Sequence, residues 1–262
     1  MILRSYEWGD PGAPPLICIH GVGSYGGSWR HVAEDRWSEH FRVIAFDLRG
    51  HHDSGWEPPW TNATYVADLI ESIDALGIEQ PDWVGLSFGG RLLLEMAVTH
   101  PERIRRAAAL EPVIQIPPEL ALHRAQQELT GDVFDSIEAF FASRENLGDI
   151  EIDAAQLAEA AEQFEPLPDG RVRRRTCQPA VVSIFSEFAA PSPPAETIAV
   201  VPTLLLYAPA FGLVTPEQRA EYEPYVTEVV EVPGLHAVLT TAYDETAGAV
   251  ERFMLQQPAP TA

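Results

Sequence analysis

The chain has 262 residues and a formal net charge of −22, and its 17 basic side chains other than histidine are all arginines. An apolar fraction of 46% is typical of a globular protein, and this length suffices for one α/β domain with an insertion. Because so acidic a chain repels other polyanions, we expect neither nucleic acid nor a membrane surface as a partner. Cys18 and Cys177 form neither a C-x-x-C pair nor a zinc cluster and are expected to be buried thiols. The first residues lack the basic and apolar regions of a signal peptide, which favours the cytoplasm.

Short apolar runs alternate with helical patterns along most of the chain. The runs end in polar or glycine-rich turns, which is typical of strands buried on both faces of a parallel sheet; they are residues 16–20, 43–47, 82–86, 107–110 and 203–207. Residues 64–76 carry apolar side chains at helical spacing. Residues 227–232 predict a last strand and residues 241–255 a final helix. This alternation predicts an α/β fold with a mostly parallel sheet flanked by helices.

The alternation stops in the middle of the chain. Residues 117–194 read as several amphipathic helices without obvious strands. We therefore predict a helical cap, or lid, inserted at residues 113–199, and a core domain made of residues 1–112 and 200–262.

The sharpest chemical signal is a Gly-x-Ser-x-Gly motif, formed by Gly85, Ser87 and Gly89 between a strand pattern and a helix pattern. This context is that of a nucleophile elbow, in which a strained turn exposes the serine hydroxyl at the edge of the sheet. Glycines two residues before and after the serine remove side chains that would collide with the neighbouring strand and helix. Ser87 is therefore the predicted nucleophile.

Two more segments stand at the ends of predicted strands. Residues 20–24, His-Gly-Val-Gly-Ser, follow the first buried run and lead to Trp29. His236 lies between the last predicted strand and the final helix. With the serine turn, these segments give the chain a resemblance to the α/β-hydrolase family that spans nearly its whole length.

The resemblance assigns roles to these positions. It implies that the backbone N–H groups of Val22 and Phe88 form the oxyanion hole, where one donor is commonly worth about 3 kcal/mol of barrier. His20 is expected to hold the loop rather than to transfer protons. His236 occupies the place of the family's catalytic base, and an imidazole takes up and returns a proton readily near pH 7.

Residues 46–55 look like the family's Asp-x-Arg-Gly-x-Gly-x-Ser turn, with His52 in place of the usual glycine. This turn is a scaffold loop in the family. We therefore interpret His51, His52 and Asp53 as structural and not as metal ligands, since their spacing does not indicate a site. No metal and no cofactor is implied.

The family's third catalytic residue, an aspartate, is missing from its usual place. Alignment of residues 208–211 on the familiar Gly-x-x-Asp pattern puts Phe211 there, and a phenyl ring cannot stabilise an imidazolium. Glu111 is the predicted substitute, because it ends the strand at residues 107–110 and a minority of the family keeps the acid at that strand end. Asp244 and Glu217 are weaker candidates, since they lie in helix patterns whose solvated faces explain them.

The sequence thus predicts a serine hydrolase that cleaves a carboxylic ester or a related small, partly hydrophobic acyl substrate through an acyl-enzyme at Ser87. Two alternatives remain open within the fold, a carbon–carbon bond hydrolase and a lactonase. A third is a non-catalytic binding or receptor protein that has kept the pocket and lost turnover, as Phe211 suggests.

Aromatic residues near these motifs are candidates for an apolar substrate pocket beneath the cap. Trp29 and Phe211 are the predicted substrate-binding residues, and Trp56, Trp60 and Phe88 are further candidates. The segment Leu167 to Arg175 resembles stretches in the lids of ester and carbon–carbon hydrolases, but its basic run is also typical of a solvated surface.

Overall fold

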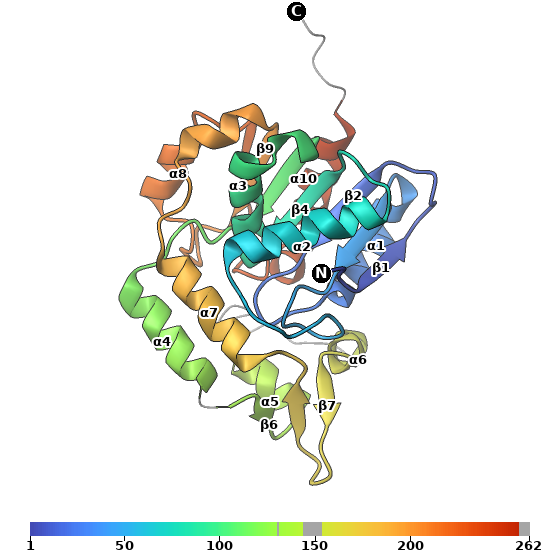
Figure 1. Cartoon of the computed structure of the whole chain (residues 1–262), viewed down its shortest axis with the longest axis vertical. Coiled ribbons are helices and arrows are strands. Elements are labelled where there is room, and N and C mark those ends of the chain that lie inside the picture. Colours follow the sequence, from blue (N-terminus) through green and yellow to red (C-terminus); the bar gives the residue numbers. More distant parts are fainter. Residues whose placement is uncertain (130, 144–153, 257–262) are drawn as a thin grey trace, which may run out of the picture.

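The computed structural model describes residues 1–129, 131–143 and 154–256. Its centre is a seven-stranded sheet in the order β1-β3-β2-β4-β5-β9-β10 (Figure 1). The strands are β1 Ser5–Trp8, β2 Pro15–Ile19, β3 Arg42–Phe46, β4 Asp82–Leu86, β5 Arg106–Leu110, β9 Thr203–Tyr207 and β10 Glu228–Glu231. All neighbouring strands pair in parallel except β1, an edge strand that runs antiparallel to β3 and that the sequence patterns did not predict.

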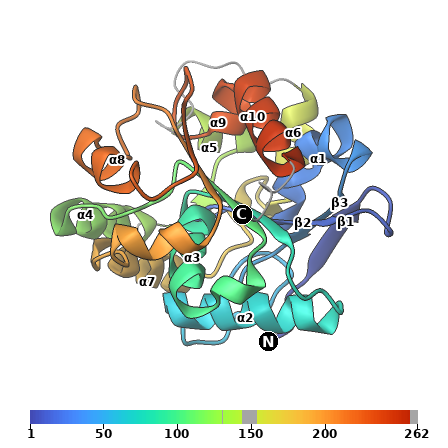
Figure 2. The same cartoon turned by 90° about the horizontal axis from the view of Figure 1, so that it is seen from above.

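Helices cover both faces of the sheet, as the alternation of patterns predicts. α2 Asn62–Ala75 and α3 Phe88–Thr99 lie on one face, and α1 Arg30–Asp35 and α10 Tyr243–Leu255 lie on the other (Figure 2). Each face has its own core, with Tyr65 and Leu92 on the α2/α3 side and Trp37 and Phe253 on the α1/α10 side. Strands buried on both faces need apolar residues without alternation, which explains the continuous runs of the sequence. Two short helices, α8 Pro216–Tyr222 and α9 Val238–Thr241, lie in the connections that follow β9 and β10.

The segment between β5 and β9 is not wholly helical, and here the sequence interpretation was wrong. It contains helices α4 Pro118–Leu129, α5 Ile137–Ala142, α6 Ala154–Ala161 and α7 Gln178–Ala189. It also contains a small antiparallel sheet in the order β6-β8-β7, made of β6 Val133–Phe134, β7 Phe164–Pro166 and β8 Val172–Arg174. Strands of two and three residues are too short to show a period-two pattern, so the residue pattern does not predict them. The division into a core and a cap stays a prediction.

The basic run of this segment lies partly on the surface and partly inside. Arg175 pairs with Asp53 in the turn after β3, which joins the inserted segment to the rest of the molecule. Arg174 is only 4% exposed and pairs with Glu128 of α4. A solvated surface therefore describes Arg175 and not Arg174. Both cysteines are buried and free, as expected.

Within the described residues, no helix is long and apolar enough to cross a membrane.

A buried ion pair fixes the turn after β3 to α2. Arg49 donates from Nε to Asp68 Oδ2 at 2.7 Å and from Nη2 to Asp68 Oδ1 at 2.8 Å. The two side chains are 10% and 3% exposed, so removal of Asp68 leaves the Arg49 charge in a poorly solvated place.

We expect Asp68→Ala to lower the free energy of unfolding by about 3–5 kcal/mol, because it leaves the Arg49 guanidinium without its carboxylate. Glu71→Ala, on the same helix but 55% exposed, serves as the control and should cost about 1 kcal/mol or less. Urea unfolding followed by circular dichroism measures both. Equal costs for the two variants would contradict this assignment of the buried pair.

Candidate active site

Ser87 stands at a sharp turn between β4 and α3. Its backbone has φ 58° and ψ −109°, a strained conformation for a residue other than glycine. A Cβ on Gly85 would lie 2.4 Å from the backbone of Gly89, and a Cβ on Gly89 would lie 2.2 Å from the carbonyl oxygen of Ile19. Such contacts explain why glycines flank the serine on both sides. The Ser87 side chain therefore stands at the carboxyl edge of the sheet and lines a cavity.

His236 lies within reach of the serine and of a carboxylate. The Ser87 hydroxyl donates to His236 Nε2, with Oγ and Nε2 2.9 Å apart. On the other side of the ring, His236 Nδ1–H donates a hydrogen bond to Glu111 Oε2, with Nδ1 and Oε2 3.2 Å apart. The three residues are thus joined in the order hydroxyl, imidazole, carboxylate, which is the arrangement of a serine hydrolase triad.

Glu111 is held by the end of the neighbouring strand. It follows β5, is fully buried, and has φ 44°. Its Oε1 accepts a 2.6 Å hydrogen bond from the backbone N–H of Ala208, directly after β9, and its own N–H donates to the carbonyl of Leu206. A buried carboxylate needs partners for both oxygens, and Ala208 and His236 supply them.

The other acids lie elsewhere. Asp244 is 89% exposed and pairs with Arg36, and Glu217 is exposed in the first turn of α8. Phe211 contacts His236. Its ring stacks on the imidazole, with 5.1 Å between the ring centroids and an interplanar angle of 20°.

The loop after β2 packs against the nucleophile. A Cβ on Gly21 would lie 3.2 Å from Ser87 Cβ, so this backbone passes directly beside the serine. Within the described residues, neither Val22 N–H nor Phe88 N–H donates to a protein acceptor. The Phe88 amide also belongs to the first turn of α3, where helix N–H groups have no partner in the helix and favour negative charge.

Two buried histidines hold this loop. His20 Nε2 accepts from the N–H of Leu48 at 3.0 Å, and its Nδ1 donates to Gly21 O at 2.7 Å. His51 Nε2 accepts from the N–H of Gly23 at 3.1 Å, and its Nδ1 donates to Arg49 O at 3.0 Å. Each ring must therefore be neutral with its proton on Nδ1. Burial lowers the pKa of His20 to about 4 and that of His51 to about 3.

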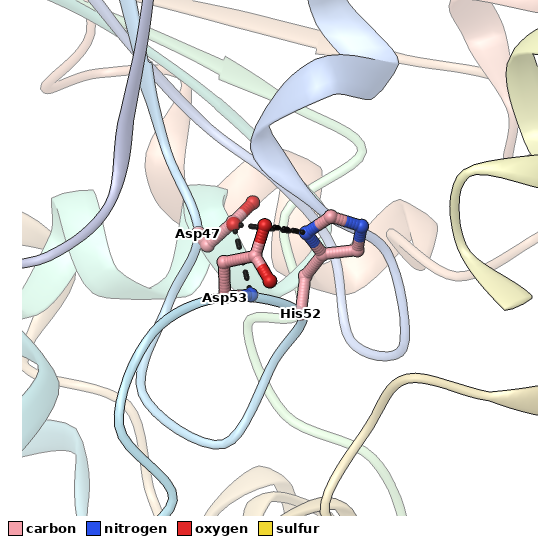
Figure 3. A group of neighbouring side chains, drawn as sticks. All are labelled: Asp47, His52 and Asp53. Carbon is pink, nitrogen blue, oxygen red and sulfur yellow. Dashed lines mark hydrogen bonds and ion pairs between the residues drawn. The ribbon is translucent and has the colours of Figure 1, made fainter. Parts of the chain in front are cut away.

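Asp47, His52 and Asp53 form a compact group in the turn after β3 (Figure 3). Their possible metal-binding atoms lie within 4.8 Å of one another. His52 Nδ1 is 3.2 Å from Asp47 Oδ2 and 3.3 Å from Asp53 Oδ2. Although burial lowers the pKa of His52, its hydrogen bonds to Asp47 and to the carbonyl of Glu162 outweigh that effect and raise it.

The contacts of this group fit an ion-pair cluster better than a metal site. Asp47 already accepts hydrogen bonds from the Tyr6 hydroxyl and from the N–H groups of Gly26 and Asp53. The Arg175 guanidinium pairs with Asp53, so positive charge is already present beside this carboxylate. His52 and Asp53 therefore have protein partners, and their interpretation as structural residues stays a prediction.

The cavity beside Ser87 has a volume of about 420 Å³. Trp29 and Phe211 belong to its wall, and helices α4 and α7 add Leu120, Phe185 and Phe188. Sequence reasoning missed these three, because apolar residues at helical spacing also fit an ordinary helix core.

Three further aromatic candidates lie away from the cavity wall, so their expected place was wrong. Trp56 is 43% exposed on the surface, Trp60 packs against the hydrophobic core, and the Phe88 ring packs edge-on against Tyr65 within that core. The Phe88 ring is therefore part of the core.

Comparison with known proteins shows the family to which the chain belongs. Residues 14–179 match the alpha/beta hydrolase fold family. Lipase LipV of Mycobacterium tuberculosis is 30% identical over 189 residues, which cover 71% of each chain. The chain therefore belongs to the α/β-hydrolase family.

Other relatives match a smaller part or only the fold. The 2-hydroxymuconate semialdehyde hydrolase of Pseudomonas putida is 38% identical over 108 residues, which cover 38% of this chain and 36% of that enzyme. The crystal structure of the enol-lactonase from Burkholderia xenovorans LB400 superposes with a TM-score of 0.80 at 22% identity, covering 97% of this chain and 96% of that one.

The neutral histidines of the loop predict a pH dependence of stability. The pKa of His51 is lower in the folded protein than in the unfolded chain, so as the pH falls below about 6.5 the unfolded chain binds the proton first and stability is lost. We expect His51→Gln, which keeps a donor and an acceptor but does not titrate, to lose about 1 kcal/mol less than the wild type between pH 7 and pH 5.5.

Urea unfolding of both proteins at the two pH values measures this difference. His100→Gln is the matched control, because His100 is only half-buried and its hydrogen bond to Thr99 is exposed to solvent. The stability of this variant should depend on pH as that of the wild type does. Parallel pH dependence in the wild type and His51→Gln would show that His51 is not held neutral.

Proposed function

We propose that the protein is a serine hydrolase that cleaves a carboxylic ester of a small, partly hydrophobic acid through an acyl-enzyme at Ser87. The observation that supports it is the chain of two hydrogen bonds from the Ser87 hydroxyl through the His236 imidazole to the Glu111 carboxylate. Such a chain needs three side chains from distant parts of the sequence to meet at one edge of the sheet.

In the first half of the reaction, Ser87 Oγ attacks the ester carbonyl carbon while His236 Nε2 takes the hydroxyl proton. The carbonyl oxygen becomes an oxyanion, which the N–H groups of Val22 and Phe88 stabilise in this proposal. The tetrahedral intermediate collapses, the bond to the alcohol oxygen breaks, and His236 returns the proton to the leaving alcohol.

In the second half, water attacks the acyl-enzyme and gives its proton to His236 Nε2. Collapse of this second intermediate breaks the bond to Ser87 Oγ, which regains the proton, and the carboxylic acid leaves. Glu111 stays ionised throughout, orients Nδ1–H and stabilises the imidazolium that forms in each half. No residue in this cycle requires a cofactor or a metal.

The cavity limits the substrate. A volume of about 420 Å³ suits a small or medium-sized molecule. The apolar side chains Leu120, Phe185 and Phe188 suit an aliphatic or aromatic acyl or alkyl group, while Arg124, Gln127 and Glu128 of α4 add polar groups to the same wall. We infer that residues 113–199 act as a cap over Ser87, since Leu120, Phe185 and Phe188 form this wall. The lipase among the relatives supports an ester as substrate.

A second candidate function is cleavage of a lactone or of a carbon–carbon bond next to a carbonyl group. The same serine, histidine and oxyanion donors serve these reactions, and the semialdehyde hydrolase and the enol-lactonase favour them. A non-catalytic receptor is the less favoured alternative, because Glu111 makes the contact to His236 that Phe211 does not provide.

Hydrolysis of short and medium-chain p-nitrophenyl esters, together with labelling by a fluorophosphonate, tests the nucleophile and the base. We expect Ser87→Ala and His236→Ala each to lower kcat/KM by at least about 10³-fold, because the serine and its base act as a unit. Ser87→Ala should also abolish labelling. Ser186→Ala is the control, since Ser186 is exposed on α7 and outside the cavity wall, and it should keep most of the activity.

Glu111→Gln tests the acid. An amide keeps the shape of the side chain but cannot stabilise the imidazolium, so we expect a loss in kcat of about 10³-fold or more. Glu217→Gln, at an exposed position, should not change kcat. A kcat within tenfold of the wild type in Glu111→Gln would mean that another group completes the triad.

A further inference from the structure

Phe211 occupies the place where the family keeps its acid, and its ring lies flat against the catalytic base. The centroids of Phe211 and His236 are 5.1 Å apart and the rings are inclined by only 20°. This is the offset-stacked geometry that aromatic pairs prefer. The Phe211 ring therefore contacts His236, the residue that the aspartate hydrogen-bonds elsewhere in the family.

The hydrogen bonds of His236 leave one motion of its ring open. Nε2 is bonded to Ser87 Oγ and Nδ1 to Glu111 Oε2, from opposite edges of the imidazole. Both bonds lie near the ring plane, so they resist displacement within the plane far better than a tilt about the line that joins them. A flat neighbour against one face restricts that tilt, and Phe211 is such a neighbour.

The backbone holds Phe211 in this place. Its N–H donates to the carbonyl of Ala208 at 3.1 Å, in the turn directly after β9. The N–H of the same Ala208 donates to Glu111 Oε1 at 2.6 Å. One residue thus anchors both the carboxylate that bonds the imidazole edge and the turn that carries the ring on its face.

The two groups that contact His236 differ in their position relative to the cavity. Phe211, like His236 itself, is part of the cavity wall, whereas Glu111 is fully buried and is not. An aromatic ring presents a negative face, which attracts the positive charge that His236 acquires when it takes the serine proton.

We propose that Phe211 is a positioning residue, which holds the His236 imidazole in its catalytic orientation by stacking and shields the His236–Glu111 bond from cavity water. The proposal rests on the proposed hydrolase function for its kinetic part. Phe211 and Glu111 together then do what a single aspartate does elsewhere in the family.

The kinetic test uses p-nitrophenyl acetate, whose small acyl group has little contact with the apolar wall. Phe211→Leu keeps an apolar side chain and removes the ring, and we expect kcat to fall about tenfold, equivalent to about 1.4 kcal/mol of barrier, with KM within twofold of the wild type. Phe211→Tyr and Phe211→Trp keep a ring and should restore kcat to within threefold. Phe253→Leu makes the same change in the core on the α1/α10 side of the sheet, outside the cavity wall, and should not alter kcat or KM.

A measurement without substrate separates this proposal from the proposed function. Proton NMR in water follows the Nδ1–H proton of His236, which the Glu111→Gln variant identifies by the loss of its downfield signal. We expect this signal to be sharp in the wild type and in Phe211→Tyr, and broadened by exchange with water in Phe211→Leu. Thermal unfolding verifies that each variant is folded, and Phe211→Met replaces Phe211→Leu if the latter is not.

Unchanged kcat and an unchanged NMR signal in the non-aromatic variant would overturn the proposal. A rise in KM alone would also overturn it and make Phe211 a substrate contact. If the wild type hydrolyses no ester but the signal broadens in Phe211→Leu, the positioning role stands and the proposed function fails.

Discussion

The arrangement of the site depends on the hydrogen bonds that the buried Glu111 carboxylate accepts. This carboxylate lies at the end of β5, bonds the backbone of Ala208 at the end of β9, and bonds His236 in the loop after β10. Three adjacent strand ends are thereby tied together by one buried group. A carboxylate without partners would be very costly there, so the fold and the position of the imidazole support each other.

Backbone strain is concentrated near the same edge of the sheet. Among the described residues, three that are not glycine have positive φ, namely His52, Ser87 and Glu111. Each such residue costs on the order of 1–3 kcal/mol and persists only where surrounding contacts compensate. Ser87 and Glu111 stand directly after β4 and β5, where the strain aims one side chain at the cavity and the other at the base.

The loop beside the serine depends on a second layer of polar contacts. His20 and His51, both in their neutral forms, make hydrogen bonds to the backbone of this loop. His52, which stands in place of the family's usual glycine, bonds Asp47 and the carbonyl of Glu162 in the inserted segment. The turn after β3 therefore connects the loop beside Ser87 to the inserted segment, which contributes residues to the cavity wall.

The sequence by itself determined the parts that local patterns encode: the buried parallel strands, the glycine-flanked turn at Ser87 and the loop that carries His236. It also predicted Glu111 as the acid, because Phe211 stands where the family has an aspartate and Glu111 lies at the end of a predicted strand. Only the tertiary structure decided that His236 reaches Glu111, 125 residues away, and Ser87, 149 residues away. It also decided the stacking of Phe211 and the small sheet of the inserted segment. Such contacts depend on how strand ends and loops pack in space, and side-chain spacing along the chain carries no information on distances between elements so far apart in sequence.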